Sequence, residues 1–173
     1  MAALVLTVIG DDRAGLVHAV AEAITEHGGN WERSQMAELA GKFAGIVLVS
    51  VDDANVDALV ASLEPLQGLL DVTVQLATGD DANDTMMRLT LDLVGTDRPG
   101  IVSDITSVLA EHRVNIETLI TETRHAPMAG GELFEAKAEL EVPTGADLDA
   151  LKDALEDLAN ELMVDIELDA TLL

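Results

Sequence analysis

An internal repeat constrains this chain more than any other feature. Shifting the 173-residue sequence by 85 positions places residues 6–32 on residues 91–117. The match resumes after a short insertion at 124–131, where Phe43–Val51 falls on Phe134–Val142. A repeat of this length predicts two copies of one structural unit. Identical pairs include Gly10/Gly95, Asp12/Asp97, Arg13/Arg98, Gly15/Gly100, Val17/Val102, Glu26/Glu111, His27/His112, Asn30/Asn115 and Glu32/Glu117.

Both copies show the same order of predicted elements. Alternating apolar residues predict strands, and apolar residues at helical spacing predict helices. In the first copy the strands cover 4–9, 30–39, 43–51 and 70–76, with helices over 16–24 and 56–63. In the second copy the strands cover 87–94, 115–123, 133–142 and 163–168, with helices over 101–112 and 148–160. The Gly28-Gly29 pair predicts the end of the first helix, and Asp52 or Asp53 is a candidate cap for the second.

The order β-α-β-β-α-β, met twice, is that of the split βαβ unit. The chain is therefore predicted to be α+β, with two tandem ferredoxin-like domains whose antiparallel sheets carry their helices on one face. The predicted domains are 1–78 and 86–173. The polar stretch at 79–85 has no periodicity and is predicted to be the linker.

Composition excludes several classes of function. The chain has 33 Asp and Glu against 9 Lys and Arg, and its net charge of −24 would repel a phosphate backbone. It has no cysteine, which excludes disulfides, a thiolate nucleophile and cysteine-bound zinc. No apolar run approaches the roughly 18 residues of a membrane span, and the apolar start lacks the basic region of a secretory signal. We expect a cytoplasmic protein that contacts neither membrane nor nucleic acid directly. Both a saline host and solubility alone would explain the acidity.

The two copies differ on the sheet face that the helices leave free. Residues 135, 137, 139 and 141 of the second copy are charged, whereas the matching residues of the first are Ala44, Ile46, Leu48 and Ser50. Val5 and Ile9 extend this apolar surface. Exposing such residues forfeits a few kcal/mol at roughly 25 cal/mol per Å2. We predict that Val5, Ile9, Ile46 and Leu48 form an interface with another sheet, helix or subunit; scattered exposed apolar residues are the alternative.

The repeated turn is the strongest chemical feature of the sequence. It leads from a strand into a helix N-terminus, where unpaired N–H groups and the helix dipole favour an anion such as a carboxylate. Glycine lets the backbone approach a ligand closely, and Pro99 suits a first helical turn. Asp12 and Asp97 offer acceptors for an amino group, so the turn suits an α-amino acid. The alternative is that each aspartate only caps its helix.

Asn30 and Asn115 begin the strand after each of these helices. Their amides offer a donor and an acceptor toward the neighbouring turn. The alternative is a left-handed asparagine that ends the helix.

No catalytic or metal site emerges from the sequence. Neither repeated turn is followed by the Lys-Ser or Lys-Thr of a phosphate loop, and no serine has a nucleophile-elbow context. His27 and His112 lie at helix ends and are interpreted as end residues rather than metal ligands. Two Phe and one Trp are too few for an aromatic platform that binds single strands. We therefore expect no enzyme activity and no cofactor.

The motif Asp-Arg-Pro-Gly-Ile-Val, followed by Val-Asn-Ile-Glu, resembles the ACT domain, a small regulatory module that binds amino acids. Asp-Arg-Ala-Gly-Leu-Val with Gly-Asn-Trp-Glu resembles a second copy. Two tandem copies without a catalytic domain resemble the glycine cleavage system transcriptional repressor group. The resemblance implies ligand sites at interfaces between ACT units, formed by the turn and the start of the second strand. On this sequence it points to Asp12, Arg13, Ala14, Gly15, Leu16 and Asn30, and to Asp97, Arg98, Pro99, Gly100, Ile101 and Asn115.

The turns depart from the family pattern at two positions. The family commonly has proline where the first copy has Ala14, and amino-acid-binding members often have asparagine where both copies have Asp12 and Asp97. These departures leave the ligand's identity open. Arg13 and Arg98 have a structural alternative, which is pairing with nearby carboxylates.

The leading functional hypothesis is a non-enzymatic regulator. An amino acid or similar metabolite would bind between ACT units of a homo-oligomer, expected to be a dimer, and change a contact with a protein partner. If the chain controls transcription, its charge favours action on a DNA-binding protein rather than on DNA. The alternatives are a structural or interaction module that binds no metabolite and a regulatory subunit of an amino-acid-metabolism enzyme.

Overall fold

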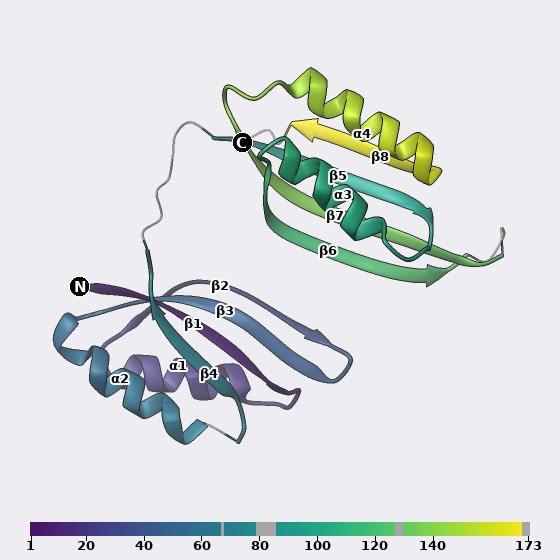
Figure 1. Cartoon of the computed structure of the whole chain (residues 1–173). Helices are drawn as coiled ribbons and strands as arrows, with labels where there is room; N and C mark the ends of the chain where they lie inside the picture. Colours follow the sequence, from purple (N-terminus) through teal and green to yellow (C-terminus); the bar gives the residue numbers. More distant parts are fainter. Residues whose placement is uncertain (67, 79–85, 127–129, 171–173) are drawn as a thin grey trace. The chain divides into compact units, whose positions relative to one another are not determined.

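The computed structural model describes residues 1–66, 68–78, 86–126 and 130–170. The chain forms two compact units, Met1–Asp81 and Ala82–Leu173, each containing one half of the repeat. Figure 1 shows one sheet and two helices in each unit. The predicted linker at 79–85 lies outside the described residues. The proposed domain bounds of 1–78 and 86–173 therefore remain a prediction.

The first unit has the predicted β-α-β-β-α-β order. Its antiparallel sheet has the strand order β2-β3-β1-β4, and α1 and α2 lie together on one face (Figure 1). The short 3-10 turns Asp53–Asn55 and Glu64–Leu66 flank α2. The element bounds are β1 Ala2–Asp11, α1 Leu16–Glu26, β2 Asn30–Leu39, β3 Lys42–Val51, α2 Val56–Leu63 and β4 Asp71–Leu76.

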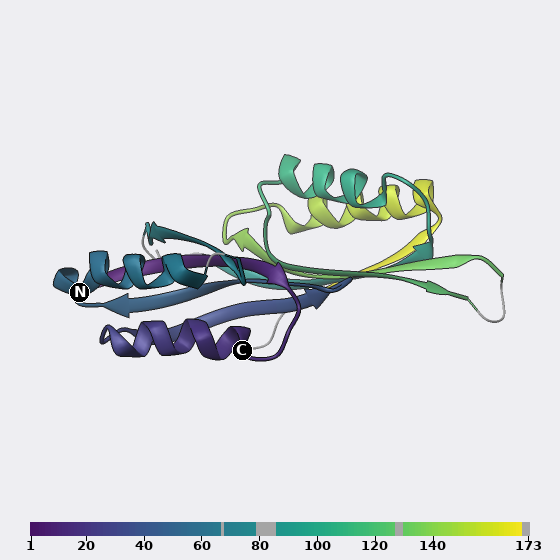
Figure 2. The ribbon, with the colours of Figure 1, turned by 90° about the horizontal axis from the view of Figure 1, so that it is seen from below.

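The second unit repeats this arrangement with the strand order β6-β7-β5-β8. Figure 2 shows α3 and α4 on the same side of its sheet. The prediction of an α+β chain with two tandem ferredoxin-like units is confirmed. The bounds are β5 Met86–Thr96, α3 Ile101–Glu111, β6 Asn115–His125, β7 Glu132–Pro143, α4 Leu148–Leu162 and β8 Val164–Ala170.

Each unit has its own apolar core between the sheet and the helices. Alternate residues of β1 point into the first core, as the burial of Leu4, Leu6 and Val8 shows. The helices contribute apolar residues at spacings of three and four. The first core contains Leu4, Leu6, Val8, Leu16, Val20, Ile24, Val47, Val49, Val51, Leu59, Leu63 and Leu70. The second contains Leu89, Leu91, Leu93, Ile101, Ile105, Leu109, Leu140, Val142, Leu151, Leu155 and Leu162.

The β2–β3 hairpin has a two-residue turn between Leu39 and Lys42. Ala40 and Gly41 have φ of 52° and 78°, the left-handed conformations that such a tight hairpin turn requires. The predicted cap of α2 by Asp52 or Asp53 is wrong. Asp52 makes no side-chain capping bond, and Asp53 lies inside the 3-10 turn, where its carboxylate accepts a bond from the N-terminal amine. The residue that directly precedes α2 is Asn55, which also makes no side-chain capping bond. In contrast, Asp147 caps α4 by accepting the Ala150 N–H at 3.0 Å.

Helices α1 and α3 end in the same left-handed turn, but with different residues. Gly28 has φ 70°, and the Gly29 N–H donates to the Ile24 carbonyl at 2.9 Å. At the equivalent position in the second unit Arg113 has φ 58°. The left-handed residue is thus not Asn30 or Asn115, which begin strands, and that alternative for the asparagines is wrong.

Replacing Arg113 with glycine should stabilise the second unit. A side chain in the left-handed region carries a steric cost that glycine lacks, so we expect about 0.5–1 kcal/mol of added stability. Calorimetric unfolding of Arg113→Gly measures it. The mirror variant Gly28→Arg should destabilise the first unit, and an unchanged transition in both variants would contradict this explanation.

Candidate functional site

The repeated turn of the first unit joins β1 to α1. Asp12, Arg13, Ala14 and Gly15 are exposed, and Leu16 is the buried first residue of the helix. Gly15 has φ 94°, and its carbonyl accepts the Ala19 N–H at 3.0 Å. The N–H groups that precede Ala19 in this first turn have no partner within the helix. The turn therefore presents unpaired donors and the positive end of a helix dipole to solvent.

The second unit has the same turn between β5 and α3. Asp97, Arg98, Pro99 and Gly100 are exposed, and Ile101 is buried. Gly100 has φ 98° and accepts the Asp104 N–H at 2.9 Å through its carbonyl. The two turns therefore share the same left-handed glycine at the helix start.

Backbone hydrogen bonds fix each turn to the neighbouring hairpin. The Asp12 N–H donates to the Gly41 carbonyl at 2.9 Å, and the Asp97 N–H donates to the Glu132 carbonyl at 2.8 Å. Neither aspartate makes a side-chain capping bond to its helix, so the capping alternative is wrong for both. Their carboxylates are left free to accept a donor from elsewhere.

Both turn arginines lie near a carboxylate of their own unit. The Arg13 guanidinium is 3.8 Å from Asp11, and the Arg98 guanidinium is 3.5 Å from Asp104. A hydrogen bond and the charge of Lys42, followed by the charge of Arg13, lower the pKa of Asp11. These groups are exposed, so the pairs are weak and can rearrange around a bound anion.

The glycines of each turn have two different roles. A Cβ on Gly10 would lie 2.4 Å from the Leu69 carbonyl oxygen, and one on Gly95 would lie 2.2 Å from the Val164 side chain. These two glycines therefore allow close packing within the unit rather than approach by a ligand. Gly15 has nothing within 4 Å of its Cβ position, and it is the glycine that leaves open space at the helix end.

Replacing Gly10 with alanine should destabilise the first unit by about 2 kcal/mol, because the new methyl group meets backbone that must move. Trp31 is the single tryptophan of the chain and packs on the first core, so its fluorescence in a urea titration reports this unit. The control is Gly145→Ala in the second unit, where a Cβ meets nothing within 4 Å. Equal midpoints for Gly10→Ala and the unsubstituted chain would contradict the packing role.

Asn30 and Asn115 do not lie beside the turn of their own unit. Asn30 pairs with Ser50, which pairs with Ala3, whereas the turn follows Asp11 at the other end of β1. At about 3.3 Å per residue, this separation along the strand exceeds roughly 20 Å. Asn115 is likewise placed opposite Glu141 and Arg88, far from Thr96. The expectation that each amide faces the neighbouring turn is wrong within a unit.

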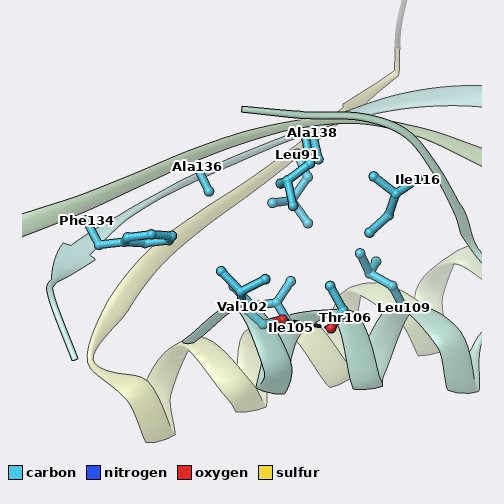
Figure 3. Close-up of a pocket in the computed structure, with 10 residues that line it drawn as sticks. Leu91, Val102, Ile105, Thr106, Leu109, Ile116, Phe134, Ala136 and Ala138 are labelled. Atoms are coloured by element: carbon cyan, nitrogen blue, oxygen red, sulfur yellow. Dashed lines mark hydrogen bonds between the residues drawn. The ribbon is translucent and has the colours of Figure 1, made fainter. Parts of the chain in front are cut away.

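The structure reveals an apolar cavity that the sequence did not predict. It lies between α3 and the sheet of the second unit, as Figure 3 shows. Its volume is about 20 Å3, which holds no more than a water-sized molecule. Small residues on β7 leave this space: Ala138 stands where the first unit has Val47. The cavity is lined by Leu91, Val102, Ile105, Thr106, Leu109, Ile116, Leu119, Phe134, Ala136 and Ala138. It is too small and too apolar for an amino acid.

The two repeated helix-end histidines each contact a carbonyl oxygen of their own helix. Nδ1 of His27 is 2.8 Å from the Ala23 carbonyl oxygen, and Nδ1 of His112 is 2.9 Å from that of Val108. Over the described ranges, no three His, Cys, Asp or Glu side chains form a cluster suited to a metal ion. Within the same ranges, no helix combines the length and apolar character needed to cross a bilayer.

The helix-free faces of the two sheets differ as predicted. In the first unit Ile9 and Ile46 are 48% and 49% exposed, and Val5 and Leu48 are half-buried. In the second unit Lys137 pairs with Asp92 at 3.6 Å, where the first unit has Ile46 opposite Thr7. The sequence pattern thus located both faces correctly.

A carboxyl pair lies on the helix-free face of the second unit. Burial, and then a hydrogen bond and the charge of Glu141, raise the pKa of Glu117 despite the nearby Arg88. Arg88 lies 3.4 Å from Glu117 and 3.9 Å from Glu141. Two carboxylates so close hold a proton more tightly than either would alone.

This pair predicts how stability changes with pH. Since the folded pKa of Glu117 is raised, the folded state binds the proton more tightly, and stability falls as pH rises from the ordinary glutamate range through the raised value. In Glu117→Gln, which has no carboxyl group at this position, this pH-dependent loss of stability should be absent. Melting temperatures between pH 4 and pH 7 test it, with Glu122→Gln on the same strand as control. A constant difference between Glu117→Gln and the unsubstituted chain across that range would refute it.

The fold and the repeated turn place the chain in the class of small tandem α+β domains. Models of the ACT domain match residues 2–77 and residues 83–161. The chain therefore belongs to the ACT-domain family and contains two tandem ACT domains.

Two relatives extend over nearly the whole chain. The glycine cleavage system transcriptional repressor of Escherichia coli (strain K12) is 26% identical over 162 residues, which cover 92% of this chain and 85% of the repressor. A crystal structure of an unknown protein from Galdieria sulphuraria is 33% identical, with a TM-score of 0.90, and the match covers 99% of each chain. The tandem arrangement is therefore shared with both relatives, and the predicted resemblance to the repressor group is confirmed.

Proposed function

We propose that this chain is a non-enzymatic regulator that binds an amino acid or a similar small metabolite at its two turns. The observation that carries the proposal is the repeated helix start, in which an open left-handed glycine precedes unpaired N–H groups. A carboxylate satisfies those donors and interacts favourably with the dipole. Membership of the ACT family and similarity to a transcriptional repressor support a regulatory role.

The side chains beside the turn recognise the charged groups of the amino acid. In this proposal the exposed Asp12 and Asp97 carboxylates accept hydrogen bonds from the ligand's ammonium group, and the guanidinium groups of Arg13 and Arg98 donate to its carboxylate. Ala14 and Pro99 are the exposed apolar neighbours of these groups, whereas Leu16 and Ile101 contribute their backbone N–H groups and bury their side chains in the core. Charge-assisted hydrogen bonds of this kind are the strong ones in a partly exposed site.

The positions of the asparagines determine whether the proposed site requires more than one ACT unit. Asn30 and Asn115 lie at the sheet end opposite their own turn, so one small ligand cannot contact both within a unit. If they bind the same ligand as the turn, they belong to another ACT unit, and the site requires an oligomer. Ligand binding then favours one packing of units over another and changes the surface offered to a protein partner.

A screen of the twenty amino acids by thermal shift tests the proposal. A ligand that binds only the folded state stabilises it by about 2.7 kcal/mol at one hundred times its Kd, so a positive result shows as a melting temperature that rises with concentration.

Variants identify the residues that bind the ligand. Loss of a charge-assisted bond in Asp12→Ala with Asp97→Ala should weaken binding about tenfold or more by calorimetric titration. The control is Asp153→Ala, an exposed aspartate of α4. Asn30→Ala with Asn115→Ala reports whether the asparagines contribute. A well-folded chain that no amino acid stabilises, or equal affinity in the aspartate variant, would defeat the proposal.

The net charge of −24 favours action through a protein. A regulator of transcription with this charge would act on a DNA-binding protein rather than on DNA itself. A second candidate function is an interaction module, or a regulatory subunit of an amino-acid-metabolism enzyme, that binds no metabolite. The apolar helix-free face of the first unit favours it, and a pull-down with the intact chain separates the two by the partner that is recovered.

A further inference from the structure

We call the helix-free face of the first unit the outer face, and its central residues are uncharged. Cross-strand pairing places Val5 beside Leu48, Thr7 beside Ile46 and Ile9 beside Ala44. The flanking strands continue these rows with uncharged residues, namely Gln35, Ala37, Thr73 and Gln75. Alternation along the strands puts all of them on the side opposite the core.

Charges on this face lie only at its margins. Lys42 pairs with Asp11 at one end of β1, Asp71 stands opposite Ile9 on β4, and Arg33 stands opposite Leu48 on β2. Glu32 lies in the bulge between Trp31 and Arg33 and is the repeat equivalent of Glu117, so it adds a third negative group at the β2 edge. Two positive groups therefore nearly balance three negative ones, in a chain whose net charge is −24. The apolar residues gather at a sheet face that carries little of this acidity.

The matching face of the second unit has the opposite character. Its two central strands carry Arg88, Asp92, Glu135, Lys137, Glu139 and Glu141, and its edge strand β8 adds Asp165, Glu167 and Asp169. Val94 and Ile120 are exposed there, but each stands among these charges: Val94 pairs with Glu135 and Ile120 pairs with Lys137. Two such faces would repel each other, because acidic residues outnumber basic ones.

We propose that the outer face of the first unit packs against the same face of a second copy of this chain, forming a symmetric dimer. A strongly acidic chain meets its own copy at a high electrostatic cost over most of its surface, and the nearly neutral outer face avoids most of that cost. A cationic partner would be drawn instead to the acidic surfaces. The two-fold symmetric contact places Val5, Ile9, Ile46 and Leu48 of both copies in one apolar layer.

The sequence of the chain supplies an unusually well-matched test. Ile46 and Leu48 correspond in the repeat to Lys137 and Glu139, so Ile46→Lys with Leu48→Glu gives the first unit residues that the same fold tolerates in the second. The mass of the intact chain is measured by sedimentation and light scattering over a wide concentration range. We expect a dimer of the unsubstituted chain and a rise in its dissociation constant of about 100-fold or more in the double variant.

Two matched single substitutions distinguish loss of the dimer from misfolding. Ile9→Glu should dissociate the dimer, whereas Val94→Glu, at the equivalent position of the second unit, should leave it intact. Trp31 fluorescence and circular dichroism confirm that each variant is folded. An unsubstituted chain that is monomeric at all concentrations would overturn the proposal, as would a dimer that survives both substitutions in the outer face or dissociates equally with Val94→Glu. Because none of these residues belongs to the turns, the result is independent of amino-acid binding.

Discussion

Each unit is a two-layer structure in which the helices cover only one face of the sheet, and most of its properties depend on this. One set of alternating residues must be apolar to form the core, as Leu4, Leu6 and Val8 are. The alternate strand residues face away from the core and need not be apolar, so the two copies differ at these positions. Ile46 and Lys137 occupy the same position, yet one gives an apolar surface and the other an ion pair with Asp92. A duplicated fold thus carries two different surfaces over cores that are apolar in both copies.

The strand-to-helix turn shows the reverse behaviour, because it is kept in both copies. Gly10 and Gly95 allow the chain to pack closely against itself, and Gly15 and Gly100 set the left-handed start of a helix. The result in each unit is a helix end whose donors face solvent beside an aspartate and an arginine. This arrangement is the basis of the proposal that the turns bind a small anion that also carries donors.

The sequence predicted what depends on local spacing. Alternation and helical periodicity gave the elements, their order and the identity of the outer face. It could not place Asn30 relative to Gly15, since that distance depends on strand registers between segments far apart in the chain. The left-handed Arg113 was also missed, because only its tertiary setting forces a non-glycine residue into that conformation. The cavity beneath α3 depends on the combined volumes of residues from several elements, among them Ala138 and Phe134. A local sequence pattern does not predict how such residues fill the space between elements.

The claim that the two turns bind a small carboxylate-bearing metabolite can be tested directly by nuclear magnetic resonance. The backbone amides of Gly15, Leu16 and Val17, and of Gly100, Ile101 and Val102, are followed while an amino acid identified by screening is added to the labelled intact chain. The account predicts saturable shifts that centre on these six amides and extend to the side chains of Asp12 and Asp97. Shifts that centre elsewhere, with these amides unchanged at saturation, would contradict it.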